Sequence, residues 1–229
     1  MRNNKNNLSI LAFLSAEMVL YTLVLTTGGD LLVWSSFGAI VLCFLFALLR
    51  GGEGLLVAGL GCTVAADFFL VVCSPIQQLY GMICFLAVQT LYAVFLLRGG
   101  VNRVRLGVRL GLMVGIVAVA VVILKDKTDA LALVSVCYYV NLIMNMVEAF
   151  AEFRKFRLLA MGLVLFILCD TVIGLQVASG GYLPIGEETL LHRILFVDFN
   201  LSWFFYLPSQ VLIALTAANR KQKRVPRFS

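Results

Sequence analysis

Eight apolar stretches follow one another along the sequence, and each is about as long as a helix that crosses a lipid bilayer. Crossing roughly 30 Å of hydrocarbon takes about 20 predominantly apolar residues per helix. The connections between the stretches are short, so little of the chain is left for a soluble domain. We therefore expect one transmembrane domain over residues 1–229, an all-α bundle with eight transmembrane helices at residues 8–26, 31–49, 55–73, 79–97, 106–124, 130–150, 158–178 and 194–217.

Composition supports this class of protein. Hydrophobic residues make up 62% of the chain and charged residues only 13%, and the mean hydropathy is +1.00. A soluble domain has about 25% charged residues. We expect a multi-pass protein of the cell membrane, with its chemistry inside or at the edge of the bilayer.

The net charge of +6 is distributed unevenly over the predicted connections. Of the 18 Lys and Arg residues, only Lys125, Lys127 and Arg193 fall on one side of the predicted membrane. All the others fall on the opposite side, together with both termini. In this count Arg109 belongs to the fourth connection. Basic residues mark the cytoplasmic side of a membrane, so both termini are predicted to be cytoplasmic. This placement favours membrane lipids as partners, or a simple topology anchor, over nucleic acid.

Two aspartates, Asp67 and Asp170, lie deep inside predicted helices, where an ionised carboxylate costs at least about 2.5 kcal/mol. Counted from Leu55 and Leu158, both stand at the same position of their helices. These helices are four apart in order and run in the same direction, which indicates a possible four-plus-four internal repeat. The alternative is a chance similarity between two apolar helices. Two carboxyl groups at matched depth indicate a functional pair.

A polar stripe follows one face of the predicted sixth helix. Its members are spaced by three or four residues, which places them on the same side of a helix; they are Tyr138, Asn141, Asn145, Glu148 and Glu152. Such a face turns away from lipid, so it either lines a polar cavity or joins helices through hydrogen bonds. Further polar residues in other predicted helices can face the same chamber: Glu17, Gln89, Tyr92 and Gln210.

Several chemistries lack the residues that they need. No lysine lies inside a predicted helix to form a Schiff base, and His192 is the only histidine. The six cysteines form no CxxC pair, so the chain offers no zinc site, and we expect no metal and no cofactor. If the protein is an enzyme, its acid and base are carboxyl groups.

Short motifs occur in a fixed order along the second part of the chain. The third predicted helix contains Ala66-Asp67-Phe-Phe-Leu70, the seventh contains Cys169-Asp170, and the eighth contains Tyr206-Leu-Pro-Ser-Gln210. With this order and placement, residues 55–215 resemble the YhhN family of lysoplasmalogenase-type integral membrane proteins. The chain departs from the family pattern at three positions. Members usually carry glycine in place of Ala66, often histidine in place of Gln89, and often serine in place of Cys169.

The resemblance implies an eight-helix fold and hydrolysis of the vinyl-ether bond of lysoplasmalogens, which yields a fatty aldehyde and a glycerophospho headgroup. Cleavage begins with protonation of the vinyl-ether β-carbon, and water attacks the resulting oxocarbenium ion. The reaction needs one neutral carboxylic acid and one carboxylate, a pair that two nearby carboxyl groups can supply. Our hypothesis assigns these roles to Asp67 and Asp170, in either order. The lipid substrate would be bound by Glu17, Gln89, Tyr92, Tyr138, Asn141, Asn145, Glu148 and Gln210.

Two alternatives remain open at this point. A small-molecule or proton-coupled transporter also fits duplicated halves and carboxyl groups inside the membrane. A catalytically inactive lipid-binding relative fits the replacement of the usual histidine by Gln89.

Overall fold

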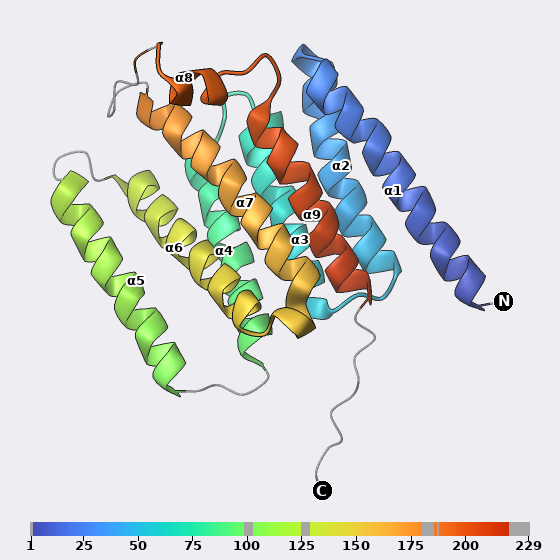
Figure 1. Ribbon diagram of the computed structural model, residues 1–229, viewed down its shortest axis with the longest axis horizontal. Coiled ribbons are helices and arrows are strands. Elements are labelled where there is room, and N and C mark those ends of the chain that lie inside the picture. The colour runs from blue at the N-terminus through green and yellow to red at the C-terminus, as the bar shows by residue number, and fades with distance from the viewer. Residues whose placement is uncertain (1, 99–102, 125–128, 180–185, 187, 220–229) are drawn as a thin grey trace, which may run out of the picture.

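The structure is a computed structural model that describes residues 2–98, 103–124, 129–179, 186 and 188–219, and this part of the chain contains helices and no strands. The long helices alternate in direction, and α1 begins at the same end of the bundle at which α9 ends (Figure 1). The elements are α1 (Arg2–Thr26), α2 (Gly29–Leu49), α3 (Gly54–Asp67), the π-helical turn η1 (Phe68–Val72), α4 (Gln78–Leu97), α5 (Arg103–Leu124), α6 (Ala130–Ala151), α7 (Phe153–Ser179), α8 (Leu190–Leu195) and α9 (Leu201–Asn219).

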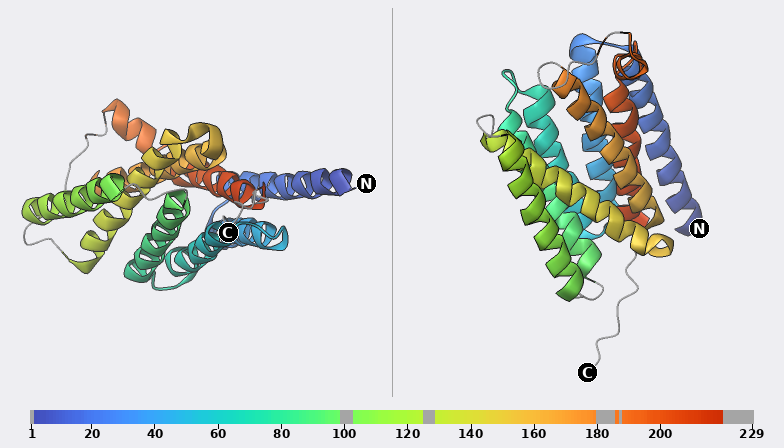
Figure 2. Two further views of the ribbon diagram at one scale, coloured as in Figure 1. Left: turned by 90° about the horizontal axis from the view of Figure 1, so that it is seen from below. Right: turned by 60° about the vertical axis from the view of Figure 1, so that its left-hand side comes forward.

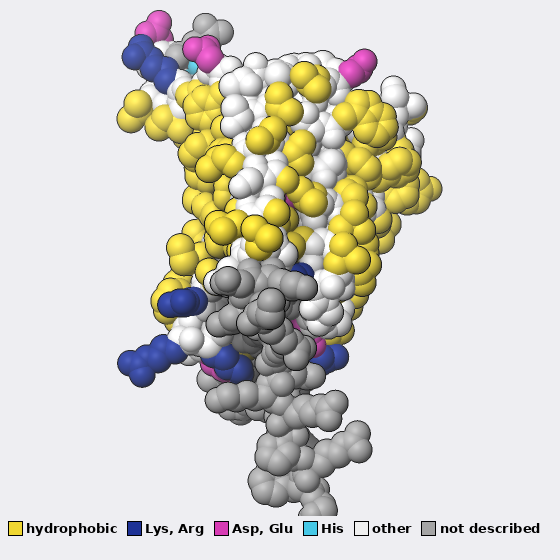
Figure 3. All heavy atoms as spheres, turned by 90° about the vertical axis from the view of Figure 1, so that its right-hand side faces the viewer, with side chains coloured by type: hydrophobic (Ala, Val, Ile, Leu, Met, Phe, Trp, Pro, Cys, Tyr) yellow, Lys and Arg dark blue, Asp and Glu magenta, His cyan; other side chains and the backbone are white. Residues whose placement is uncertain are grey.

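By length and composition, seven helices within the described residues can cross a membrane, and α5 adds a shorter apolar stretch, Leu106–Val122. On the face shown in Figure 3, apolar side chains are spread over the length of the bundle, and charged side chains gather at its two ends. The protein is therefore a helical multi-pass membrane protein. The count of eight spans and the cytoplasmic position of the termini stay predictions, and Lys125, Lys127 and the tail from residue 220 lie outside the described residues.

The predicted helix boundaries were wrong in two places that matter for the site. The segment predicted at 194–217 is divided into α8 and α9, because residues 196–200 are not helical and the Asn200 side chain accepts a hydrogen bond from the Trp203 backbone (3.3 Å). Asparagine favours such a cap over a helix interior. The third segment does not stay α-helical to residue 73, because it becomes π-helical directly after Asp67.

Six helices form a closed ring in the order α2, α3, α4, α6, α7 and α9, and each packs against the next. The ring is flattened into two layers, with α2, α3 and α4 in one and α6, α7 and α9 in the other (Figure 2). Outside the ring, α1 packs against α2 and α9, whereas α5 packs against α6. If α1, α2, α3 and α4 correspond to α5, α6, α7 and α9, the two halves of the chain follow each other around the ring in the same order. This arrangement is compatible with the predicted repeat, which stays a prediction.

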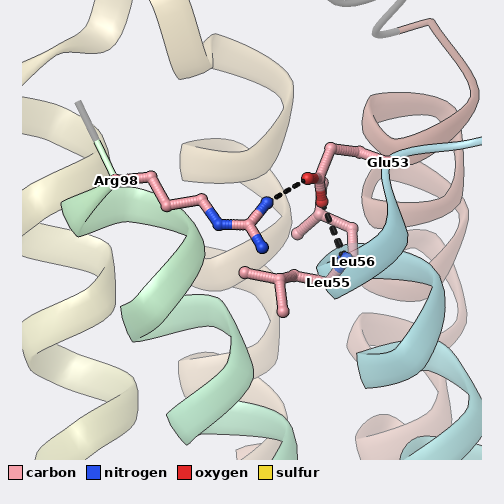
Figure 4. A network of polar contacts seen from close by, with 4 residues as sticks. All are labelled: Glu53, Leu55, Leu56 and Arg98. Carbon is pink, nitrogen blue, oxygen red and sulfur yellow. Dashed lines mark hydrogen bonds and ion pairs between the residues drawn. The ribbon is translucent and has the colours of Figure 1, made fainter.

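A polar clamp fixes the start of α3 at the end of the bundle where α1 begins. The Glu53 carboxylate accepts hydrogen bonds from the backbone of Leu55 (2.9 Å) and Leu56 (3.3 Å), which caps the helix. The same carboxylate pairs with Arg98 at the end of α4 (2.7 Å; Figure 4). The Glu53 backbone N–H donates to the Ala217 carbonyl of α9 (3.1 Å). One residue therefore holds three helices of the ring in register.

Glycine allows α3 and α4 to approach each other closely. A Cβ atom at Gly59 would lie 2.3 Å from the Cε1 atom of Tyr92, whose ring is fully buried. Only a residue without a side chain fits this distance. Tyr92 thus serves as a packing residue between two helices that carry site residues.

Candidate functional site

Asp67 is the last residue of α3 and is buried at the inner side of the ring. The Tyr206 hydroxyl of α9 donates a hydrogen bond to Asp67 Oδ2 over 2.8 Å, and both side chains are about 95% buried or more. The π-helical turn starts at the next residue, and such turns occur frequently at functional sites. Tyr206 belongs to a motif of the predicted eighth helix, but its pairing with Asp67 was not predicted, since the sequence does not show which helix faces Asp67.

Asp170 lies in the middle of α7 and is half-buried. The hydroxyl group of Tyr138, on α6, donates to Asp170 Oδ2. Tyr138 was expected to contact substrate, and the structure places it as the partner of one of the two carboxyl groups. The helix has a kink at Phe156, so its regular segment begins at Arg157, whereas α3 begins at Gly54. The number of residues from Arg157 to Asp170 equals the number from Gly54 to Asp67. The two aspartates therefore keep matched positions along their regular helical segments.

Two phenylalanine rings connect these aspartate–tyrosine pairs by packing against the tyrosine of each pair. Phe85 lies 5.6 Å from the Tyr138 ring and 6.3 Å from the Tyr206 ring, measured between centroids. Phe166 lies 6.4 Å and 5.3 Å from the same two rings. Asp67 and Asp170 are also close enough to interact electrostatically. The two pairs thus belong to one site, in which Phe85 and Phe166, which we call the aromatic spacer, each contact the tyrosine rings of both pairs.

Two asparagines of the α6 polar stripe, Asn141 and Asn145, contact an arginine. Arg109 Nη2 donates to Asn141 Oδ1 (2.7 Å) and to Asn145 Oδ1 (2.8 Å). Asn145 Nδ2 in turn donates to the Gln89 backbone carbonyl (2.8 Å) and to Gln89 Oε1 (2.9 Å). We call Arg109, Asn141, Asn145 and Gln89 the arginine cluster. Charge placement assigned Arg109 to a connection; that assignment was wrong, because the residue lies inside α5 and is 5% exposed.

Three other predicted site residues lie outside the two aspartate–tyrosine pairs. Glu17 of α1 is buried against α2, where its carboxylate accepts a hydrogen bond from the Cys43 thiol (3.3 Å). Gln210 is fully buried in α9, and neither polar atom of its amide has a hydrogen-bond partner among the described residues. Glu148 is half-buried and acts electrostatically on Arg109. The structure therefore connects Glu148 to the arginine cluster, whereas Glu17 lies between two other helices.

The site presents a chemically simple set of groups. It holds two carboxyl groups, each with one hydroxyl donor, inside an otherwise apolar part of the bundle. An apolar environment disfavours an ionised carboxyl group, and two neighbouring carboxyl groups favour a state with one proton between them. Such a pair can donate a proton with one member and accept one with the other.

Comparison with known protein families matches residues 31–217 to the YhhN family. No curated protein and no solved structure matches the chain. The match covers both aspartates, both tyrosines, the aromatic spacer and the arginine cluster, and leaves out the whole of α1. The chain therefore belongs to the YhhN family, as its motifs and their order along the helices predict.

Proposed function

We propose that the protein hydrolyses the vinyl-ether bond of lysoplasmalogens within the membrane. Membership of the YhhN family suggests a lysoplasmalogenase-like membrane protein. The observation that carries the proposal is the site formed by Asp67 with Tyr206 and Asp170 with Tyr138, joined by one aromatic spacer. Oxocarbenium chemistry uses such a pair of carboxyl groups.

The reaction balances with these groups and water alone. A neutral carboxylic acid gives its proton to the vinyl-ether β-carbon, and the π electrons of the double bond form the new C–H bond. The other carboxylate stabilises the oxocarbenium ion and takes a proton from the attacking water, which forms a hemiacetal. Collapse of the hemiacetal breaks its C–O bond to glycerol and gives an aldehyde and a glycerol hydroxyl group. The glycerol oxygen takes up a proton, and one carboxyl group is again neutral.

The proposal also covers the setting of the reaction. We place the protein in the cell membrane with both termini in the cytoplasm, on the basis of its charge distribution. The lysophospholipid would enter from the bilayer between helices, with its alkenyl chain in the apolar part of the bundle.

Purified protein in detergent is expected to release aldehyde from a 1-alkenyl lysophospholipid. The 1-alkyl analogue is the matched control substrate; it should stay intact, because it has no double bond to protonate. Aldehyde is measured with a coupled dehydrogenase. A transporter acts only across a sealed membrane, and an inactive relative releases nothing, so absence of aldehyde from well-folded protein in detergent contradicts the proposal.

Tyr206→Phe and Tyr138→Phe are each expected to lower the rate of aldehyde release by about 10- to 100-fold, because each removes the hydroxyl donor of a carboxyl group that is ionised at one stage of the reaction. Tyr139→Phe is a matched control, since that hydroxyl group bonds to Thr171 (2.8 Å) and to neither aspartate. Its rate should stay within about twofold of wild type. Equal rates in all three variants would show that the tyrosines do not serve the carboxyl groups.

A further inference from the structure

We propose that Arg109 binds the phosphate group of the lysophospholipid, and that the arginine cluster is therefore the headgroup subsite of the proposed enzyme. The inference rests on the proposed function for the identity of the lipid. The recognition of phosphate itself rests on the geometry around Arg109.

Arg109 has more hydrogen-bond donors than the described residues satisfy. A guanidinium group carries five N–H donors and no acceptor. Asn141 and Asn145 accept bonds from Nη2, whereas Nη1 is buried without a hydrogen-bond partner among the described residues. A buried cation inside a membrane protein is costly, and such residues commonly mark the path or site of a ligand.

A second buried donor lies in the same cluster. Gln89 uses its Oε1 atom to accept from Asn145, while its Nε2 group has no partner within the described part of the chain. Gln89 is fully buried. The cluster therefore has an excess of N–H donors beside a positive charge. A phosphodiester supplies what is lacking, because its two free oxygens carry a negative charge and only accept hydrogen bonds.

The position of the cluster also fits the length of the substrate. Along α6, Asn141 and Asn145 lie about 5 and 10 Å from Tyr138, at about 1.5 Å per residue. In a lysoplasmalogen, seven bonds separate the vinyl-ether β-carbon from phosphorus, a reach of about 8 Å at roughly 1.2 Å per bond. A lipid whose phosphate contacts Arg109 thus places its vinyl ether at the level of Tyr138 and Asp170. The headgroup would then face the end of the bundle at which the two termini are predicted to be cytoplasmic.

A structural role for Arg109 makes a different prediction. The arginine joins α5 to α6, and the charge of Glu148 acts on it, so it can also serve to attach a peripheral helix. Loss of an attachment weakens the binding of every ligand, or the fold as a whole. Loss of a phosphate contact weakens only ligands that carry phosphate.

The test compares two non-hydrolysable ligands by isothermal titration calorimetry in detergent. One is a 1-alkyl lysophospholipid, and the other is the 1-alkylglycerol of the same chain length, which lacks only the phospho headgroup. Wild-type protein should bind the phospholipid about 10- to 100-fold more tightly, the range of a charge-assisted hydrogen bond. In Arg109→Gln this ratio should fall to about one, with binding of the alkylglycerol unchanged, and Arg109→Lys should keep an intermediate ratio. Arg157→Gln, at an exposed residue of α7, is the matched control and should keep the wild-type ratio.

Three results would overturn the inference: no preference in the wild type, an unchanged ratio in Arg109→Gln, or parallel weakening of both ligands. The first needs no variant, so it remains decisive if Arg109→Gln fails to fold. Competition by inorganic phosphate or glycerophosphocholine would show that free phosphate compounds also bind, and absence of competition would identify the lipid headgroup as the ligand. Either outcome supports phosphate recognition.

Failure of this inference can be distinguished from failure of the proposed function. The binding test uses lipids that cannot be cleaved, so it is independent of catalysis. If hydrolysis occurs, Arg109→Gln should raise KM by about 10- to 100-fold and leave kcat within about threefold, because the arginine contacts the headgroup and not the reacting atoms. If Arg109→Gln hydrolyses the substrate with an unchanged KM, the proposed phosphate subsite is refuted, whereas the proposed hydrolase function is retained.

Discussion

Asp67→Asn and Asp170→Asn are each expected to abolish measurable aldehyde release. General acid–base catalysis contributes about 10²- to 10⁴-fold, and here one pair of carboxyl groups supplies both partners. Asparagine has almost the same volume and can still accept a hydrogen bond from Tyr206 or Tyr138 through its amide oxygen. The variants should therefore fold, and their loss of activity would report on proton transfer.

The measurement is the initial rate of aldehyde formation by purified protein in detergent, together with its melting temperature. Asp30→Asn provides the matched control, because Asp30 is exposed in the first turn of α2 and should retain full activity. Wild-type turnover in either site variant would remove that aspartate from the mechanism. Full activity in both would refute the proposed chemistry.

Phe166→Ala is expected to lower the free energy of unfolding by about 3–5 kcal/mol, the usual cost of truncating a buried phenylalanine. Phe166 is 1% exposed and packs against the rings of both Tyr138 and Tyr206. Its loss leaves a cavity between the two aspartate–tyrosine pairs, so activity should fall as well. Phe166→Leu fills most of the space and should cost less.

Chemical denaturation in detergent gives the stability change. Phe150→Ala is the control, because this ring is 44% exposed and its truncation should change stability by only about 0.5 kcal/mol. A Phe166→Ala protein as stable as the control would show that the aromatic spacer does not hold the site together.

The apolar runs of the sequence predict most of the fold because each spanning helix must satisfy its own backbone hydrogen bonds. They identify all the long helices, and they place Asp67 and Asp170 within α3 and α7. They miss the break before α9, where the side chain of Asn200 caps a helix. They also miss the π-helical turn after Asp67, since its residues are as apolar as those of an α-helix.

The contacts of the site depend on helix packing, which a single sequence does not encode locally. Asp67 and Tyr206 are separated by 139 positions, and nothing in their local patterns connects them. Arg109 was counted as a surface residue because arginines near helix ends usually extend to the membrane surface. A signal was present in the α6 stripe, because buried asparagines require donors from a neighbouring helix. The position of Glu17 in the sequence likewise does not show that its hydrogen-bond partner is Cys43 of α2.

Glu53 fixes the register of the helix that ends at Asp67, because it caps α3 and pairs with Arg98 at the end of α4. A helix behaves as a stiff rod, so a shift of one residue at its first turn would move the far end by about 1.5 Å and rotate it by about 100°. Asp67 stands at that far end, while Glu53 and Arg98 lie at the margin of the bundle, where Arg98 is 53% exposed. The position and direction of the Asp67 carboxyl group thus depend on contacts made at the opposite end of α3, where Arg98 is accessible to solvent.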